Sequence, residues 1–444
     1  MWPVPISIPY MKTSVFGLDF GTTNSSLAGV MPNGEVMLAQ FHAKHGITES
    51  FRSLLYLEKH EGPGRHRTTV WSGPRAIDAY LEADTKGRLI QSLKSFLTSR
   101  GLRTTEIFGR QYKLEELIAR IVRGIREEAE KAWGVEIRSI VAGRPVWFVG
   151  ADAEEDNAFA ANRLESALKL AGFEQVRFEY EPIGAAYHYE STLDHEELIL
   201  IGDFGGGTSD FSLLRVGPNK QRPGHDLLGN DGVGVAGDAF DAKIIRYVVA
   251  PELGAGSEMR SIDKILPVPQ WVYGRLERWH HVSFLKSREV LNMLQSVEAQ
   301  ALEPRKIGAL LYLIREDLGY QLHQAVQSTK VQLSAGEQAA FHFDDGDVVI
   351  DTTVKRRDFE AWIGGELQMI ETCVDRLLRG ASVAAKDVDM VFLTGGSSFV
   401  PAVRSIFESR FGSERIRSGH EFTSVARGLA LRAQRLPAPA VPSR

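Results

Sequence analysis

Features typical of secreted and membrane proteins are scarce in this sequence of 444 residues. Its single cysteine, Cys373, excludes an internal disulfide, and one thiol holds no metal cluster. A nucleophilic thiol would need a paired histidine to which the sequence does not point, so we expect Cys373 to be buried in a helix in a reducing compartment. No apolar run approaches the roughly 18 residues of a membrane span. We therefore expect a cytoplasmic protein with no membrane partner.

Long basic runs are also absent. Lysine and arginine number 52 against 57 aspartate and glutamate, which gives a net charge of -5. Nothing in this balance favours nucleic acid as a partner. Hydrophobic residues make up 43% and charged residues 25%, an ordinary globular mixture. At this length we expect two or three domains.

The two ends of the chain lack regular patterning. Prolines interrupt the apolar start Met1–Tyr10, and no basic segment precedes it, so it does not resemble a signal peptide. We expect residues 1–12 to be a disordered extension, with Met11 as an alternative start. The stretch 436–444 carries three prolines, and we expect it to be a flexible tail.

Strands and helices alternate through the first part of the chain, which predicts an α/β fold with a sheet covered by helices. Apolar spacing makes Lys113–Trp133 an amphipathic helix. Between about 254 and 335 turn signals thin out, and we expect a helical insertion there. The remaining predicted strands are Val15–Phe20, Ser25–Val30, Glu35–Ala39, Leu54–Leu57, Thr68–Trp71, Ile137–Ala142, Pro145–Val149, Val176–Tyr180, Leu198–Ile201, Ala339–Phe343, Val348–Thr352 and Met390–Thr394. The other predicted helices are Ala153–Leu170, Pro182–Tyr189, Arg357–Leu378, one that begins at Pro401, and Thr423–Arg435.

One pattern occurs twice. An apolar strand enters Asp-Phe-Gly at Asp19 and again at Asp203, and each time small residues, threonine and a second strand follow. The two aspartates are 184 positions apart (203 minus 19). A matched pair at this separation indicates a duplicated domain.

The two glycine-rich turns suit phosphate binding. Glycine lets backbone N–H groups approach a phosphate closely, and a threonine hydroxyl adds a donor. The aspartate at each strand end is suited to a hydrated Mg²⁺, which neutralises phosphate charge. The alternative is that Gly21 and Gly205–Gly207 only make tight turns. A third loop, Gly395-Gly396-Ser397, follows a strand and offers N–H groups to an anion or a polar base.

These loops, in this order, resemble the actin-like ATPase superfamily and, within it, the heat shock protein 70 (DnaK-type) chaperones, over about Ser14–Arg435. The segments VFGLDFGTTNSSLAGV, LILIGDFGGGTSDFSLL and MVFLTGGSSFVPAVR are similar to that family's two phosphate loops and adenosine loop. EPIGAAY, VAGDAFD and SLKSFL match three further segments more loosely. The resemblance implies two ribonuclease-H-like lobes, 13–195 and 196–435, around a cleft for Mg²⁺-ATP.

The resemblance also implies residue roles. Asp19 and Asp203 would hold Mg²⁺ through water. Lys94 would stabilise γ-phosphate charge, and Glu181 and Asp203 would position the attacking water, with Thr208 beside them. Residues expected to bind the nucleotide are Gly21, Thr22, Thr23, Gly205, Gly206, Gly207, Thr208, Gly237, Lys330, Ser334, Gly395, Gly396, Ser397 and Phe399. Lys94 is otherwise a solvated lysine on a helix, and Glu181 an acid stabilised at a helix N-terminus.

The chain departs from the family pattern near the base. Gln327 stands where the family has glutamate, Val331 and Phe399 where it has arginine, and the region of Phe422 lacks an aspartate. The phosphate half of the site is therefore expected to be intact and the base half altered, which bears on nucleotide affinity and adenine preference. Phe399 either stacks on the base or packs into the core.

The leading functional expectation is an ATP-binding and ATP-hydrolysing member of the chaperone family that acts as a nucleotide-driven conformational switch, read by a protein partner. We expect no linker or client-binding part after the ATPase segment, in which the chain would resemble the short, YegD-like members. The alternatives are an actin-like filament protein, a small-molecule kinase of the same fold, and a nucleotide binder without turnover. A kinase would need an aspartate base for a substrate hydroxyl, and the sequence offers none apart from the Mg²⁺ candidates.

Overall fold

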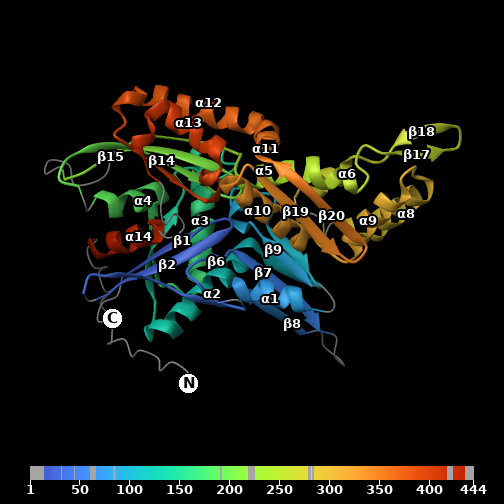
Figure 1. The fold of residues 1–444 in the computed structure, drawn as a ribbon. Coiled ribbons are helices and arrows are strands. Elements are labelled where there is room, and N and C mark those ends of the chain that lie inside the picture. The colour runs from blue at the N-terminus through green and yellow to red at the C-terminus, as the bar shows by residue number, and fades with distance from the viewer. Residues whose placement is uncertain are drawn as a thin grey trace, which may run out of the picture.

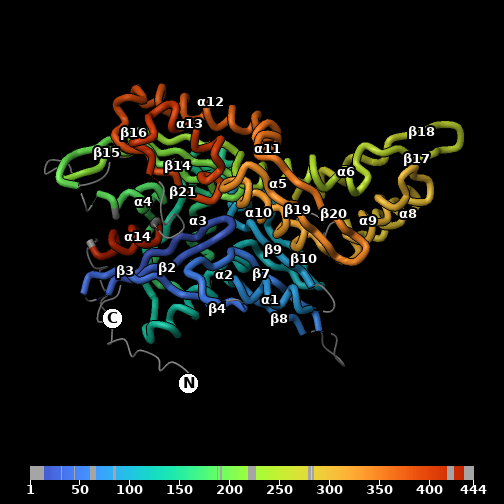
Figure 2. The backbone as a smooth tube through the Cα atoms, in the orientation of Figure 1, coloured from blue at the N-terminus to red at the C-terminus, as the bar shows by residue number. Residues whose placement is uncertain are grey.

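The fold is described from a computed structural model of the chain. The described residues are 15–31, 33–44, 46–60, 67–83, 87–190, 193–218, 226–278, 282, 285–417 and 424–435. The predicted extension 1–12, the tail 436–444 and Phe422 lie outside them. Figures 1 and 2 show the arrangement of the elements.

The expected alternation of strands and helices is confirmed only in part. In the described residues, strands follow one another without a helix as far as residue 72, and regular alternation spans residues 114–204. The strands are β1 (Phe16–Phe20), β2 (Asn24–Val30), β3 (Val36–Leu38), β4 (Phe41–Ala43), β5 (Gly46–Thr48), β6 (Phe51–Arg52), β7 (Leu54–His60), β8 (Arg67–Ser72), β9 (Arg88–Gln91), β10 (Thr104–Ile107), β11 (Arg110–Lys113), β12 (Ser139–Arg144), β13 (Gln175–Tyr180), β14 (Glu197–Phe204), β15 (Ser209–Val216), β16 (Asp226–Val233), β17 (Glu258–Ser261), β18 (Lys264–Pro267), β19 (Gln338–Asp345), β20 (Val348–Lys355), β21 (Met390–Thr394) and β22 (Ile416–Arg417). The α-helices are α1 (Pro74–Glu82), α2 (Leu114–Trp133), α3 (Glu154–Leu170), α4 (Glu181–Glu190), α5 (Gly237–Ile244), α6 (Ala250–Glu252), α7 (Trp271–Leu276), α8 (Arg288–Gln300), α9 (Pro304–Arg315), α10 (Gly319–Ala335), α11 (Arg356–Trp362), α12 (Gly364–Gly380), α13 (Pro401–Phe411) and α14 (Ser424–Arg435). Short helical turns are η1 (Leu93–Phe96), η2 (Ile245–Val249), η4 (Ala385–Asp387), η5 (Gly396–Phe399) and η6 (Ser413–Arg415).

Two five-strand paths form the frame of the molecule, and they share one pattern. The first sheet runs β13-β12-β1-β2-β3, with β6 added beside β2. The second sheet runs β16-β15-β14-β21-β22. In each, a central strand pairs antiparallel with the next strand of the chain and parallel with a later one: β1 with β2 and β12, β14 with β15 and β21. The two Asp-Phe-Gly turns therefore occupy equivalent places, at the ends of β1 and β14.

Local sequence explains why the central elements form. Strand β14 is apolar and buried from Leu198 to Ile201, as expected for a strand covered on both faces. Helix α2 begins where the Glu116 carboxylate accepts the backbone N–H of Lys113 at 2.7 Å, and it ends at Gly134 with φ 67°. Its apolar face packs into the core of the first sheet.

Helices α4 and α14 lie together between the two sheets at one side of the molecule (Figure 1). On α4, Ile183 and Ala186 pack against β14 and β15. On α14, Ala426 and Ala430 pack against β2 and β3. Helix α14, late in the chain, therefore covers strands formed at its beginning.

A second contact between the parts of the chain lies near β7. Helix α1 carries Tyr80, whose hydroxyl donates to the Asp317 carbonyl oxygen at 2.8 Å, just before α10. The Tyr80 and Tyr320 rings meet edge to face at 6.1 Å. These contacts join α1, which packs beside the small sheet β8-β7-β9, to α10 in the second half of the chain.

The predicted helical insertion is helical in part. Helices α7, α8, α9 and α10 lie within it, but 258–267 form the β17–β18 hairpin that the sequence reading missed. Helices α8 and α9 and this hairpin extend away from the body (Figures 1 and 2). Ile262 at the hairpin turn is fully exposed, so no packing pattern marks these short strands.

Two further expectations are wrong. Residues 145–149 form a loop rather than a strand, because β12 ends at Arg144 and the following backbone turns toward the cleft described below. The helix expected at Arg357–Leu378 is two helices, α11 and α12, separated at Ile363 before Gly364-Gly365. Paired glycines lower helix propensity enough to allow such a break.

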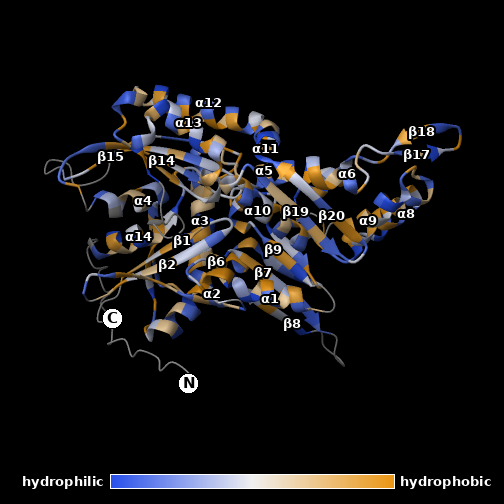
Figure 3. Cartoon of the chain, in the orientation of Figure 1, coloured by the Kyte–Doolittle hydropathy of each residue, from blue (hydrophilic) through white to orange (hydrophobic). Residues whose placement is uncertain are grey.

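Apolar residues fill the space between sheets and helices, and hydrophilic residues lie outside (Figure 3). Cys373 is buried on α12, as expected. Among the described helices, none has a long enough apolar stretch to cross a bilayer. The boundaries 13–195 and 196–435 stay a prediction.

Candidate active site

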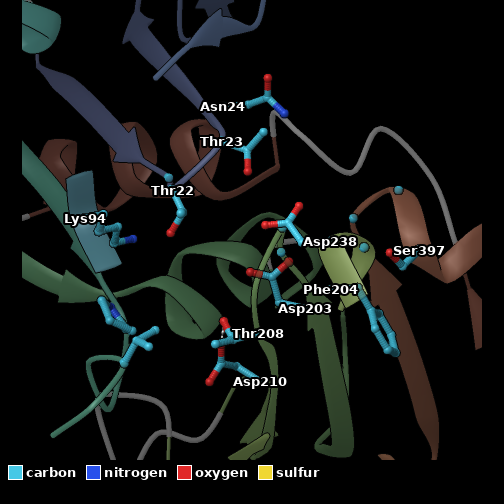
Figure 4. Close-up of a pocket in the computed structure, with 18 of the residues that line it drawn as sticks. Thr22, Thr23, Asn24, Lys94, Asp203, Phe204, Thr208, Asp210, Asp238 and Ser397 are labelled. Carbon is cyan, nitrogen blue, oxygen red and sulfur yellow. Dashed lines mark hydrogen bonds between the residues drawn. The ribbon is translucent and has the colours of Figure 1, made fainter. Parts of the chain in front are cut away.

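A cleft of about 330 Å³ collects most of the predicted site residues. Side chains from both sheets point toward it (Figure 4). The predicted residues that line it are Asp19, Gly21, Thr22, Thr23, Lys94, Glu181, Asp203, Gly205, Gly206, Thr208, Gly237, Lys330, Gly395, Gly396 and Ser397.

The first turn joins β1 to β2 and requires glycine. A Cβ on Gly21 would lie 2.1 Å from the Asn24 carbonyl oxygen, closer than any side chain tolerates. Asp19 is the second-last residue of β1, so its carboxylate lies at the base of this turn. Thr22 and Thr23 follow at the crest, beside the cleft.

The second turn joins β14 to β15. It is closed by the Gly205 N–H, which donates to the Thr208 carbonyl oxygen at 2.9 Å. The Thr208 hydroxyl donates to the Asp210 carboxylate at 3.0 Å, and the Thr394 hydroxyl donates to Asp203 at 2.8 Å. These bonds fix the directions of the two carboxylates.

The two turns touch each other. A Cβ on Gly206 would stand 2.4 Å from the Thr23 hydroxyl oxygen, so only glycine permits this approach. The Gly206 carbonyl oxygen also accepts the N–H of Asp238 at 2.8 Å, which ties the second turn to α5. A ligand in the cleft therefore meets backbone from both turns at once.

Lys94 is not a solvated lysine. Its Nζ lies 2.7 Å from the Glu181 carboxylate, and the two side chains are only 10% and 15% exposed. Burial alone would lower the pKa of Lys94, but Glu181, Asp19 and Asp203 together raise it. The lysine is thus held charged among carboxylates.

The carboxylates are crowded and partly buried. Burial first, and then the charge of Glu181, raises the pKa of Asp19 to about 8. Burial likewise raises the pKa of Glu181 and of Asp203. Such crowding of acids around one lysine leaves negative charge that a cation would neutralise.

The third loop meets α5 and α10 on the other side of the cleft. Gly395 has φ 86°, and a Cβ there would stand 2.0 Å from the Phe204 carbonyl oxygen. Lys330 lies 2.7 Å from the Asp241 carboxylate and donates to the Gly237 carbonyl oxygen at 3.4 Å. Gly237 in turn approaches the Ser397 hydroxyl. These groups surround the part of the cleft remote from Lys94.

Three predicted residues do not reach the cleft in the described part of the chain. Gly207 and Ser334 are absent from its lining, and the Ser334 hydroxyl instead donates to the Lys330 carbonyl oxygen at 3.1 Å. Phe399 is also absent from the lining, and its side chain is 49% exposed. The prediction that Phe399 packs into the core is therefore wrong.

Sequence reasoning missed several polar residues of the cleft. Asp210 is the direct cross-strand partner of Asp203, and alternation along β15 from Thr208 was the signal for it. Asp238 and Asp241 lie in the VAGDAFD segment, of which the sequence predicts only Gly237 as a site residue. Arg52 carried no local signal, because it lies in a two-residue strand away from every motif.

Comparison with known proteins places this site in a family. The family model described as Hsp70 protein matches residues 73–259 and 315–440, more than half of the chain. The chain belongs to the Hsp70 family. The Hsp70 match leaves out residues 1–72, which carry the first glycine turn, and 260–314, which contain β18, α7, α8 and most of α9.

Individual Hsp70 relatives are distant. The stromal 70 kDa heat shock-related protein of Pisum sativum chloroplasts is 24% identical over 435 residues, which cover 95% of this chain and 53% of the relative. The chaperone protein DnaK of Thermus thermophilus is 25% identical over 424 residues, which cover 94% of this chain and 60% of the relative. The chain thus spans about half the length of the curated relatives it matches.

The carboxylates fit a hydrated cation. No group of three or more metal-ligating side chains occurs in the ranges that the structure describes. Asp19 and Asp203 lie close enough for their charges to interact, and both line the cleft. Mg²⁺ keeps several waters and uses few carboxylates, so this donor set suits it.

Proposed function

We propose that this Hsp70-family chain binds Mg²⁺-ATP in the cleft and hydrolyses it. The contact between the two glycine turns, Gly206 against Thr23, carries this proposal. Two opposed glycine turns suit a polyphosphate held from both sides. The buried Lys94–Glu181 pair supplies charged groups beside them.

The finer architecture belongs to the same proposal. We take the two sheets as duplicated ribonuclease-H-like lobes, about 13–195 and 196–435, with an insertion at about 254–335. Their identical strand pattern supports this division. ATP would lie where the paired turns meet, as ligands commonly do at strand ends.

The side chains divide the chemistry of phosphoryl transfer, which is mostly positioning and charge neutralisation. Lys94 would stabilise charge on the transferred phosphate. Glu181 orients Lys94 and, with Asp203, would position the attacking water, while Thr208 would donate to a phosphate oxygen. A bound Mg²⁺, held by Asp19 and Asp203 through water, would neutralise phosphate charge.

The nucleoside would lie among Gly237, Lys330 and the loop 395–397. Lys330 and the Ser397 hydroxyl supply donors there. Gln327 and Val331 also line this part, without the charge that the family pattern has at those places. We therefore propose weak discrimination between ATP and other nucleoside triphosphates.

Turnover by the purified protein, with and without Mg²⁺, tests the proposal. Asp203→Asn should lower turnover by about 10²–10³-fold, because a preorganised charged contact is lost. Asp344→Asn, an exposed carboxylate on β19, is the control and should leave the rate unchanged. Equal rates for wild type and Asp203→Asn would refute the assignment.

The same assay separates the alternatives. Tight ATP binding without turnover would favour the non-hydrolysing binder. Turnover only with an added hydroxyl acceptor would favour a kinase, and sedimentation of ATP-dependent polymers would favour a filament protein. In our proposal the output is a change of shape, read by a protein partner.

A further inference from the structure

Arg52 has no role in the chemistry above, although it lines the cleft. It lies on β6, directly opposite Asn24 in the register of β2. Its guanidinium donates to the Asn24 side-chain oxygen at 3.2 Å. The next residue, Ser53, donates its backbone N–H to the Thr23 carbonyl oxygen at 2.9 Å. Arg52 is thus fastened to the first glycine turn.

Charge pairing distinguishes Arg52 from the other cations of the cleft lining. Lys94 is paired with Glu181, and Lys330 with Asp241, each at 2.7 Å. Among the described residues, Arg52 has no carboxylate within ion-pair distance, and its hydrogen-bond partner is a neutral amide. Burial lowers the pKa of Arg52, so its charge is held away from bulk water. A cation that is partly buried is stabilised by an anionic partner.

Asp238 is the carboxylate that faces Arg52 from the second part of the chain. Burial raises the pKa of Asp238, and among nearby cations Lys330 and Arg278 oppose this more strongly than Arg52 does. Asp238 therefore has positive neighbours other than Arg52. An anion that enters the cleft would give Arg52 the partner that the described residues do not supply at ion-pair distance.

We propose that Arg52 binds a phosphate group of the nucleotide. The inference rests on the proposed nucleotide site, and it adds a positively charged donor beside the first turn, where Gly21, Thr22 and Thr23 are neutral. A guanidinium suits this role, since its planar N–H groups match phosphate oxygens in pairs. The Asn24 amide and the strand pairing of β6 hold it in place before the ligand arrives.

Calorimetric binding of ATP, ADP and AMP to wild type, Arg52→Gln and Arg52→Lys tests this. Arg52→Gln should weaken ATP binding at least about tenfold, the usual effect of losing a charged hydrogen bond. The loss of affinity in Arg52→Gln should be largest for ATP and smallest for AMP. Arg52→Lys keeps a positive charge and should therefore bind ATP more tightly than Arg52→Gln. Arg67→Gln, an exposed arginine on β8, is the control and should change nothing.

Each other outcome has a definite meaning. Equal ATP affinity in wild type and Arg52→Gln overturns this inference alone. The same holds if Asp238→Asn causes the same loss and the double variant loses no more, because Arg52 then pairs with Asp238. Failure of the wild type to bind any of the three nucleotides overturns the proposed function as well.

A measurement on the wild type avoids any folding defect of the variants. Phenylglyoxal modifies arginine, and peptide mapping reports its extent at Arg52 and Arg67. ATP and ADP should protect Arg52 and adenosine should not, with Arg67 unaffected. Equal protection of Arg52 by adenosine and ATP would contradict a phosphate contact.

Discussion

Buried acids give the cleft of this Hsp70-family chain its character at the scale of single residues. Asp19, Glu181, Asp203 and Asp210 lie within range of one another's charge, with Lys94 as their shared cation. Each carboxylate is costly to ionise away from water. The arrangement is therefore least favourable when the cleft holds no additional cation.

The Asp19 carboxyl should lower the stability of the free protein as pH rises from about 4 to about 8. Folding raises the pKa of Asp19 from its ordinary 3.8 to about 8, so in this range the folded protein keeps a proton that the unfolded chain has lost. Asp210, raised to about 7 by burial and Asp203, adds to the fall over the lower part of the range. Above about 8 Asp19 is ionised in both states, and its contribution to the slope ends.

The measurement is the Tm against pH for wild type and Asp19→Asn without nucleotide. The variant should show a shallower decline, because its side chain does not titrate. Asp344→Asn serves as the exposed control and should follow the wild type. Parallel curves for wild type and Asp19→Asn would contradict the raised pKa.

Phe399 is the second residue whose effect is predictable. Its ring is half exposed, so Phe399→Ala should leave the Tm nearly unchanged, within about 0.5 kcal/mol of stability. Phe399 does not line the cleft in the described residues, and stacking on a bound base is the other alternative that the sequence left open. If the ring did stack there, ATP and GTP should both bind more weakly to Phe399→Ala by about 1–3 kcal/mol. Unchanged affinities for both nucleotides would exclude the stacking.

At the scale of elements, buried strands and amphipathic helices were predictable, and irregular segments were not. The β1–β2 and β14–β15 hairpins and α2 follow from apolar runs, glycine turns and helical spacing. Pro145–Val149 has the composition of a strand, but Trp147 and Val149 are substantially exposed and the segment pairs with nothing in the described sheets. The β17–β18 hairpin lacks a buried face, so alternation could not reveal it.

The packing of α14 on the first sheet gives a prediction about glycine. A Cβ on Gly17 of β1 would stand 2.3 Å from the Ala430 backbone nitrogen and 2.5 Å from the Ala426 carbonyl oxygen. Backbone atoms cannot move aside alone, so Gly17→Ala should cost about 1–3 kcal/mol by overpacking. Denaturant unfolding measures the loss.

The matched control is Gly274→Ala in α7. A Cβ there meets no atom within 4 Å, so the change should be neutral or slightly stabilising, as alanine favours a helix. Equal stabilities of Gly17→Ala and wild type would mean that α14 does not press on β1 as described.

At the scale of the whole molecule, the two sides of the cleft are joined at several places. Tyr80 reaches the Asp317 carbonyl oxygen across one of them, and α4 and α14 lie at another. Gly206 and Thr23 meet directly between these places. A ligand held by both turns would therefore favour the more closed arrangement.

Mg²⁺-ATP should make the molecule more compact. Small-angle scattering should give a smaller radius of gyration with Mg²⁺-ATP than without, and hydrogen exchange should slow in the turns 21–23 and 205–208. The reason is that a γ-phosphate commonly orders the segments it contacts. Identical scattering and exchange profiles in the two states would count against a conformational switch.

The candidate site was only partly predictable. The turns and Lys94 were found because motifs mark them, whereas Arg52, Asp210 and Asp238 are brought to the cleft by strand register and by α5. Ser334 was expected at the site, but its hydroxyl is used within α10. Motif spacing predicts the glycine turns themselves. Which neighbouring side chains reach the cleft depends on tertiary packing, which the motifs do not contain.

The position of α14 has a consequence for how the protein is made. A ribosome delivers β1 and β2 long before residues 424–435, yet those residues cover the two strands. Until they arrive, the apolar face around Ala28 and Val30 has no native covering from α14 and is open to premature association. This part of the fold can therefore be completed only after residues 424–435 have left the ribosomal exit tunnel. A pause or truncation before them would leave an aggregation-prone nascent intermediate.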